Sequence, residues 1–276
     1  MHGKGSEFQA ETIGMGVVAV REAQAQGGHI VRLTIDNARK LNTLNRALMV
    51  EFVETLAALE QDATLRLVIL SGAGERAFVG GADIDELALL DAETARDFIT
   101  LVHRCCDGCR RLPVPVIARI DGYALGAGLE LAAACDLRVA SSRSMFGMPE
   151  VRIGVPSVVE AALLPQLVGH GRSRQLLLTG EMIDAPTAAA WGLIDRVAPP
   201  QALDAAVERL AAPILDSGPH AIRIQKALIR DWEELPTSAA VARGIDAFTE
   251  AYATDEPRRM AAARLAEMRA RRKEPG

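Results

Sequence analysis

Two glutamates stand in stretches of the chain that otherwise consist mainly of small and apolar residues. Glu130 interrupts the run DGYALGAGLELAAACD (residues 121–136), and no Lys or Arg follows it before Arg138. Glu150 follows a proline in FGMPEVRIG, again with apolar neighbours. Burying a carboxylate costs free energy unless a partner or a function compensates. Because burial and mutual repulsion raise the pKa of one carboxyl of such a pair and leave the other ionised, the two residues are candidates for an acid and a base at neutral pH.

Two glycine loops lie close to these glutamates. FVGGADI (residues 78–84) and YALGAGLE (residues 123–130) each follow a predicted buried strand and lead toward a helix. Small residues let the backbone approach a ligand, and a helix N-terminus leaves N–H groups unbonded. Two such N–H groups that converge on one oxygen would stabilise an oxyanion, so the loops and the carboxylates together indicate chemistry through an enolate. The alternative is that the glycines only permit close packing.

Other catalytic motifs are weak or absent. Gly72-x-Gly74-x-x-Ala77 is a loose dinucleotide fingerprint, but it continues into FVGGAD, whereas that motif requires a helix. The sequence contains neither G-x-x-x-x-G-K-[ST] nor G-x-S-x-G. A nicotinamide site, a P-loop and an acyl-enzyme elbow are therefore not predicted.

Three of the four cysteines lie close together in the sequence. Cys106 and Cys109 make a C-x-x-C with His103 nearby, and Cys105 and Cys135 complete the set. A zinc site usually needs two separated ligand pairs, and the sequence has no second pair. We predict packed thiols and no metal site.

Composition and charge narrow the class of partner. The 276 residues carry 31 Lys and Arg against 36 Asp and Glu, a net charge of −5. Nucleic-acid binders are usually basic, so no nucleic-acid partner is expected. No stretch reaches the ~18 apolar residues of a membrane span, and MHGKGSEFQ lacks the apolar region of a secretory signal. We expect a cytoplasmic protein that is not bound to a membrane.

The periodicity predicts an alternation of strands and helices. Residues 16–20 and 29–36 read as a hairpin, residues 45–62 as an amphipathic helix and residues 66–72 as a buried parallel strand. A second helix is predicted from residue 92 to residue 112.

The same order then repeats. Residues 114–121 predict a strand, a helix begins near Gly128, and residues 137–141 predict another strand. Ser157 and Glu160 have the spacing of a capping box at a further helix start. Beyond Pro199 and Pro200 the pattern is almost wholly helical. The predicted fold is an α/β body followed by a helical region.

Several ordered segments resemble the crotonase superfamily, also called the enoyl-CoA hydratase/isomerase family. The resemblance spans about residues 12–270. Its segments are DNARKLNTLN, FVGGADIDEL, IDGYALGAGLELAAACDLRVAS, FGMPEVRIGVP and AAAWGLIDRV.

The resemblance implies an α/β fold, a crotonase-like spiral of ββα units over residues 12–200. Residues 201–276 would form a C-terminal helical region that mediates trimerisation, giving a homotrimer or a dimer of trimers. The implied substrate is an acyl-CoA thioester. Coenzyme A would be part of that substrate, and no separate cofactor is expected.

The resemblance also implies the site. The backbone N–H groups of Ala82 and Ala127 would hold the thioester oxygen, and Glu130 and Glu150 match the family's two catalytic glutamates. Glu150 is expected to protonate the α-carbon, while Glu130 holds and activates the water that adds to the β-carbon.

Further contacts are expected along the coenzyme. The adenine end would meet Lys40 and Leu41, and Arg258 and Arg259 would meet the phosphates. Further residues expected to contact the substrate flank the two oxyanion segments: Gly81, Asp83, Ile84 and Gly126.

The expected function is that of an enoyl-CoA hydratase, a lyase of fatty-acid metabolism. The alternatives are an enoyl-CoA double-bond isomerase, another crotonase-type acyl-CoA lyase, and a non-catalytic acyl-CoA-binding or RNA-binding relative. Two segments depart from the family. The C-terminal helix reads DEPRRMAAARL and lacks the usual Phe. After Glu150 the chain reads GVPSVVEAALLP, with Val158, Val159 and Glu160 where a glycine-rich turn is usual.

Overall fold

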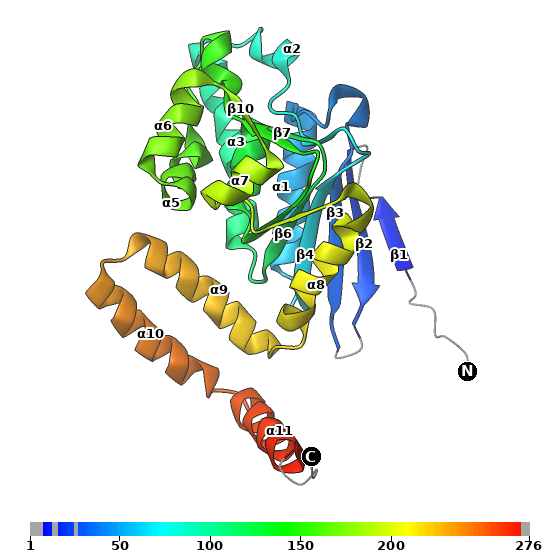
Figure 1. Ribbon diagram of the computed structural model, residues 1–276, viewed down its shortest axis with the longest axis vertical. Helices are drawn as coiled ribbons and strands as arrows, with labels where there is room; N and C mark the ends of the chain where they lie inside the picture. The colour runs from blue at the N-terminus through cyan, green and yellow to red at the C-terminus, as the bar shows by residue number, and fades with distance from the viewer. Residues whose placement is uncertain (1–7, 13–15, 25–26, 272–276) are drawn as a thin grey trace. The chain divides into compact units, whose positions relative to one another are not determined.

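The computed structural model describes residues 8–12, 16–24 and 27–271 (Figure 1). Contacts within the chain divide it into two compact units, one up to Ala211 and one from Ala212 on. The predicted division into domains 12–200 and 201–276 stays a prediction. No helix in the described ranges has the length and apolar character needed to cross a membrane.

The described residues of the first unit include a mixed sheet of seven strands. Its strands lie in the order β1-β2-β3-β4-β6-β8-β11. β1 to β3 pair antiparallel, and every later pair is parallel. The bounds are β1 Phe8–Thr12, β2 Val17–Ala23, β3 His29–Ile35, β4 Leu65–Gly72, β6 Val116–Ile120, β8 Leu137–Ser141 and β11 Arg196–Ala198.

The sequence pattern explains the positions of these strands. In β4 the first six residues are all buried, as expected of a parallel strand covered on both faces. In β3 burial is more nearly alternating, which suits a strand at the antiparallel side of the sheet. The predicted hairpin and the predicted parallel strands are therefore confirmed.

A second sheet consists of four three-residue strands in the order β10-β9-β7-β5. Three of them directly follow a strand of the first sheet: β5 follows β4, β7 follows β6, and β9 follows β8. After β5 and β7 the chain continues into helices. The order strand, strand, helix therefore repeats, as the resemblance implied. The bounds are β5 Ala77–Val79, β7 Tyr123–Leu125, β9 Met145–Gly147 and β10 Met182–Asp184.

Three helices build the core beside the site. α1 (Arg46–Glu60) packs against α3 (Ala92–Arg111), which in turn packs against α4 (Ala127–Ala134). Asn45 caps α1, its side chain accepting from the N–H of Leu48. All eight residues of α4 are buried, and this explains why its segment consists mainly of Gly, Ala and Leu.

Short helices fill the remaining connections. The α-helices are α2 Ile84–Leu87, α5 Leu164–Val168, α6 His170–Thr179 and α7 Ala185–Trp191. The 3₁₀ helices are η1 Ala38–Lys40, η2 Pro149–Ile153, η3 Val159–Leu163 and η4 Pro200–Ala202.

The C-terminal unit is helical, as predicted. α8 (Leu203–Leu215) leads into it, and α9 (Pro219–Glu234), α10 (Thr237–Ala251) and α11 (Glu256–Arg271) follow. Within the unit, α9 packs against α10, and Asp231 pairs with Arg243 at 2.8 Å. Glu256 accepts from the backbone N–H groups of His220 and Ala221 in the first turn of α9.

Candidate active site

Glu130 is held in the first turn of a buried helix. Gly126 precedes α4 with φ +51°, a conformation that a glycine adopts without strain. The Glu130 side chain is buried, with the residue only 3 % exposed. Its Oε1 accepts a hydrogen bond from the backbone N–H of Ala161 at 3.3 Å. The structure therefore places a carboxyl group among the small residues of α4, with the backbone N–H of Ala161 directed at it.

Glu150 reaches the same place from a different element. It lies in η2, directly after β9, and is half-buried. Ser157 donates a hydrogen bond from its hydroxyl to Oε2 of Glu150 at 2.7 Å. A Cβ atom at Gly126 would overlap with Oε1 of Glu150, so the glycine before α4 is what lets this carboxylate approach the helix start.

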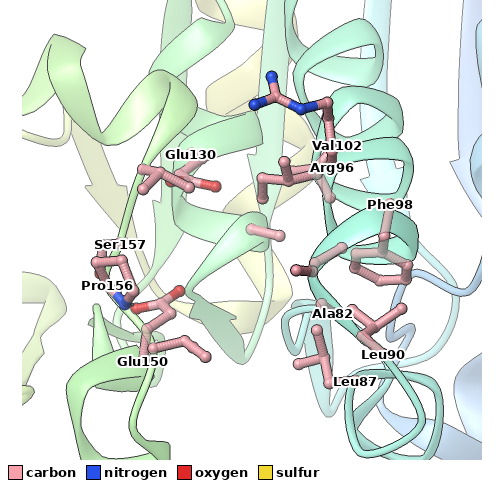
Figure 2. Close-up of a pocket in the computed structure, with 16 residues that line it drawn as sticks. Ala82, Leu87, Leu90, Arg96, Phe98, Val102, Glu130, Glu150, Pro156 and Ser157 are labelled. Atoms are coloured by element: carbon pink, nitrogen blue, oxygen red, sulfur yellow. Dashed lines mark hydrogen bonds between the residues drawn. The ribbon is translucent and has the colours of Figure 1, made fainter.

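Both glutamates line one cavity of about 470 Å³. Figure 2 shows Glu130 and Glu150 on one side of the pocket, facing a wall that includes Leu87, Leu90 and Phe98. That apolar wall comes from α2, from α3 and from the residues between them. An apolar cavity with a few convergent polar groups is the usual form of a small-molecule site.

The surroundings of Glu130 change its pKa. Burial, followed by the charge of Glu150, raises the pKa of Glu130 to about 8. The N–H of Ala161 acts in the opposite direction, because it stabilises the ionised form. Near neutral pH Glu130 therefore favours its protonated form, and a carboxyl group that changes its protonation state close to neutral pH suits acid and base chemistry.

The two residues predicted to form the oxyanion hole, Ala82 and Ala127, line the same cavity. Among residues 8–12, 16–24 and 27–271, neither N–H has a hydrogen-bond acceptor. Ala127 is the first residue of α4, where a helix cannot satisfy its own N–H groups. Beside Ala82, the carbonyl of Gly81 accepts from Leu44 at 2.8 Å, and this bond fixes the loop. The arrangement can hold one anionic oxygen.

The remaining predicted contact residues are not part of the cavity wall. Lys40 binds Asp83 at 3.0 Å and Asp85 at 2.8 Å, and Asp83 caps α2. Leu41 adopts φ +57° at the end of η1, and Ile84 is exposed. Their roles toward a coenzyme stay a prediction, as do those of Gly81 and Gly126 and the role of Arg258 and Arg259, which are exposed on α11.

Asn42 connects the predicted coenzyme segment to neighbouring backbone, although no pattern in the sequence marks it. Its side chain is fully buried. Nδ2 donates to the carbonyls of Ala73 and Ala77 at 3.0 and 2.8 Å, while Oδ1 accepts from the N–H of Asn37. A buried amide that spans two loops is a tertiary feature without a local signal. The segment LNTLN, which contains it, was however part of the resemblance.

The predicted capping box at Ser157 and Glu160 is wrong. η3 begins after Val158 without a side-chain cap among the described residues. Ser157 bonds instead to Glu150, and Oε1 of Glu160 lies 2.8 Å from Nδ1 of His103 on α3. Partners on other elements replace the local pairing, because the half-buried Glu150 and the buried Glu160 both need polar contacts.

The cysteines pack in the core, as predicted. Cys105, Cys106, Cys109 and Cys135 are all buried. Burial raises the pKa of Cys105 to about 12, so this thiol is unreactive. His103 pairs with Glu160 and not with a thiol. Within the described part of the chain, no cluster of side chains has the arrangement of a metal site.

Comparison with known proteins agrees with this geometry. The family profile described as Enoyl-CoA hydratase/isomerase matches residues 25–273. A crotonyl-CoA hydratase of Syntrophomonas wolfei is 36% identical over 225 residues, 81% of this chain and 86% of the relative. A short-chain-enoyl-CoA hydratase of Clostridium acetobutylicum is 35% identical over 230 residues, 83% of this chain and 88% of the relative.

A solved structure extends the similarity to the fold. The enoyl-CoA hydratase of Bacillus anthracis superposes with a TM-score of 0.85 at 30% identity, covering 92% of this chain and 97% of that one. A matching profile, two relatives of similar length and a shared fold all point to one family. The chain belongs to the enoyl-CoA hydratase/isomerase family and is an enzyme of the crotonase superfamily.

Proposed function

We propose that this enzyme adds water across the 2,3 double bond of a 2-trans-enoyl-CoA. One observation carries the proposal: one apolar cavity is lined by two glutamates and by two alanines whose backbone N–H groups have no acceptor in the described chain. A hydratase needs these groups together, because it must stabilise an enolate, direct a water and deliver a proton.

The thioester carbonyl oxygen accepts from the N–H groups of Ala82 and Ala127. Negative charge develops on this oxygen as the nucleophile adds, so donors fixed by the backbone stabilise the transition state more than the ground state. The apolar wall of α3 keeps bulk water away and strengthens this interaction.

The glutamate pair carries out the addition. Glu130 takes a proton from water as the C–O bond forms at the β-carbon, and Glu150 gives its proton to the α-carbon. Its raised pKa makes ionised Glu130 a stronger base than an ordinary carboxylate. The water molecule connects the two carboxyl groups, so a proton can move between them. After addition the proton rests on Glu130, and the next water returns it to Glu150.

Two features favour hydration over isomerisation. An isomerase moves a proton between two carbons, for which one carboxylate suffices. Here a second carboxylate faces the cavity beside the first. The relatives named crotonyl-CoA hydratase and short-chain-enoyl-CoA hydratase point the same way. The reaction as proposed needs no cofactor besides the coenzyme A of its substrate.

An exposed apolar stripe supports self-association as a homotrimer or a dimer of trimers. On α10, Val241, Ile245 and Phe248 are 61, 66 and 67% exposed. Tyr252, just past the helix end, continues the stripe at helical spacing, and its ring packs against Phe248. Contiguous exposed apolar side chains usually mark an interaction surface. We expect this enzyme in the cytoplasm, without a nucleic-acid partner.

The test is hydration of crotonyl-CoA, followed by loss of the absorbance of the conjugated thioester. Glu130→Gln and Glu150→Gln should each lower kcat by about 100-fold or more, because each removes a group that transfers a proton. Glu54→Gln, at an exposed position of α1, is the matched control and should retain wild-type kcat. Wild type that binds crotonyl-CoA without hydrating it would refute the proposal, and a 3-enoyl-CoA assay would then test the isomerase alternative.

A further inference from the structure

Glu160 is a third buried carboxyl group, and the proposed mechanism does not use it. The residue is 6 % exposed. One oxygen, Oε1, lies 2.8 Å from Nδ1 of His103, whose side chain is 49% exposed. The other, Oε2, is buried and has no hydrogen-bond partner among the described residues. A buried polar atom without a partner is uncommon in folded proteins and calls for an explanation.

The neighbours of Glu160 in the chain hold both catalytic carboxyl groups. Three residues before it, Ser157 donates its hydroxyl to Glu150 at 2.7 Å. One residue after it, Ala161 donates its N–H to Glu130 at 3.3 Å. We call residues 157–161 the bracket. Any shift of the bracket moves both donors, and with them both glutamates.

The bracket is not a relaxed structure by itself. Val159 has φ +39°, a left-handed conformation that a β-branched residue adopts only under constraint. No side chain of the described residues caps the start of η3. The contact from Glu160 to α3 supplies a restraint from outside the bracket, since His103 lies on a long helix anchored in the core.

We propose that Glu160 and His103 are positioning residues, whose contact fixes the bracket against α3 and so holds Glu130 and Glu150 in their reactive geometry. The inference rests on the proposed function, because it concerns how that same glutamate pair is set. Neither residue lines the cavity, so neither touches the substrate.

Charge gives Glu160 a second influence on the site. Burial raises the pKa of Glu160, and contact with His103 opposes that rise. In turn, ionised Glu160 is one of the charges that raise the pKa of Glu130. The titratable and charged groups that face Glu160 are Glu130 on α4 and, on α3, His103, Cys105, Cys106, Asp107 and Arg110.

The experiment compares Glu160→Ala, Glu160→Gln and His103→Ala with the control His29→Ala. His29 provides a matched pair elsewhere in the fold, because its Nε2 lies 3.2 Å from Oδ2 of Asp62. Each variant is assayed with crotonyl-CoA from pH 6 to pH 10, and thermal unfolding reports its folded fraction.

Glu160→Ala and His103→Ala should lower kcat by about tenfold or more at nearly unchanged KM, since small displacements of catalytic groups are costly. Glu160→Gln keeps an oxygen for His103 and should recover most of kcat. It removes the charge, however, so the alkaline limb of its pH profile should move to lower pH. His29→Ala should change neither kcat nor the limb.

Wild-type kcat and an unmoved alkaline limb in both Glu160 variants would overturn the inference. So would a loss of kcat in His29→Ala as large as that in His103→Ala. Where Glu160→Ala does not fold, the kcat of His103→Ala decides, because this change breaks the same contact.

A second readout needs no turnover. With ¹³C-labelled glutamate, the carboxyl resonance that Glu130→Gln abolishes reports the titration of Glu130. Its midpoint should lie at lower pH in Glu160→Gln than in wild type. An inactive wild type whose midpoint shifts in this way would refute the proposed function and support the influence of the Glu160 charge on Glu130. An active wild type with unchanged kcat and midpoint in the variants would refute only the inference.

Discussion

Ser157 and Glu150 are joined by a hydrogen bond of 2.7 Å from the serine hydroxyl to Oε2, and both residues line the candidate active site. The contact links two segments, η2 and the residues just before η3. It leaves Oε1 of Glu150 beside Gly126, at the start of α4. Ser157 thus holds Oε2 of Glu150, while Oε1 lies near the N-terminus of α4, where the substrate oxygen is expected to bind.

Replacing Ser157 tests whether this tether matters for the reaction. Without the hydroxyl, the Glu150 side chain gains rotamer freedom and leaves the reactive geometry part of the time. Ser157→Ala should therefore lower kcat for crotonyl-CoA by roughly 10- to 100-fold with little change in KM. Ser157→Thr keeps a hydroxyl and should retain more activity than the alanine variant. Equal kcat in wild type and Ser157→Ala would show that Glu150 needs no tether.

Gly126 should tolerate no side chain. A Cβ there would overlap with Oε1 of Glu150, and φ +51° disfavours any L-residue. Gly126→Ala should lower kcat by about 100-fold or more, because it displaces Glu150 and the adjoining N–H of Ala127 together. The assay is crotonyl-CoA hydration beside a thermal unfolding curve.

Gly244→Ala in α10 is the matched control. A Cβ at that helical position meets no atom within 4 Å. The substitution should raise stability by roughly 0.5–1 kcal/mol, since alanine is the better helix former. Activity of Gly126→Ala close to that of Gly244→Ala would mean that Glu150 does not act from the position described.

Much of the fold could be predicted from the sequence, because its signals are local. The buried run of β4 and the amphipathic period of α1 each extend over more than one repeat, so the pattern stands out. The strands β5, β7, β9 and β10 were missed, because three residues are too few to show alternation. They become strands only when neighbouring units of the spiral pair.

The site divides in the same way. Glu130 and Glu150 could be found, because a carboxylate among small apolar residues contrasts with its own neighbours. Ser157 and Glu160 were assigned to each other, because their spacing has a familiar local meaning. Their true partners lie on other elements, and only the folded chain brings these together. The helix over residues 92–112 could be predicted, but not that its residues would line a cavity.

The stripe on α10 should govern the oligomeric state. Ile245→Glu combined with Phe248→Glu would place two charges in the proposed interface, where desolvating them is costly. The variant should dissociate to a lower oligomer, measured by light scattering with size-exclusion chromatography. Asp246→Lys, an exposed change on α10 beside the stripe, should leave the assembly intact. A monomeric wild type, or an unchanged assembly in the double variant, would contradict the proposed self-association.

The shared proton should appear in the pH profile of the reaction. The pKa of Glu130 is raised to about 8, so the pair loses its proton as the pH rises through that value. Hydration requires one protonated and one ionised carboxyl group, and kcat/KM should therefore decline above about pH 8. A profile measured with crotonyl-CoA in buffers of constant ionic strength would show this limb. A rate that stays level to pH 10 would contradict the assignment.

Glu130 should also lower the free energy of unfolding at alkaline pH, because the folded and unfolded states bind its proton differently. Its pKa rises from 4.5 in the unfolded chain to about 8 in the folded one, so between these values the folded state binds more protons. Stability from this group is then fully present below pH 4.5 and is lost as the pH rises through 8. At pH 8.5, Glu130→Gln should exceed wild type by on the order of 2–4 kcal/mol in the free energy of unfolding, and at pH 5 by much less. Urea unfolding at both pH values measures the difference, with Glu54→Gln as the exposed control that should change neither. An equal effect of Glu130→Gln at the two pH values would mean that the carboxyl is not held protonated by its burial, and the site would then lack the shared proton on which the proposed reaction depends.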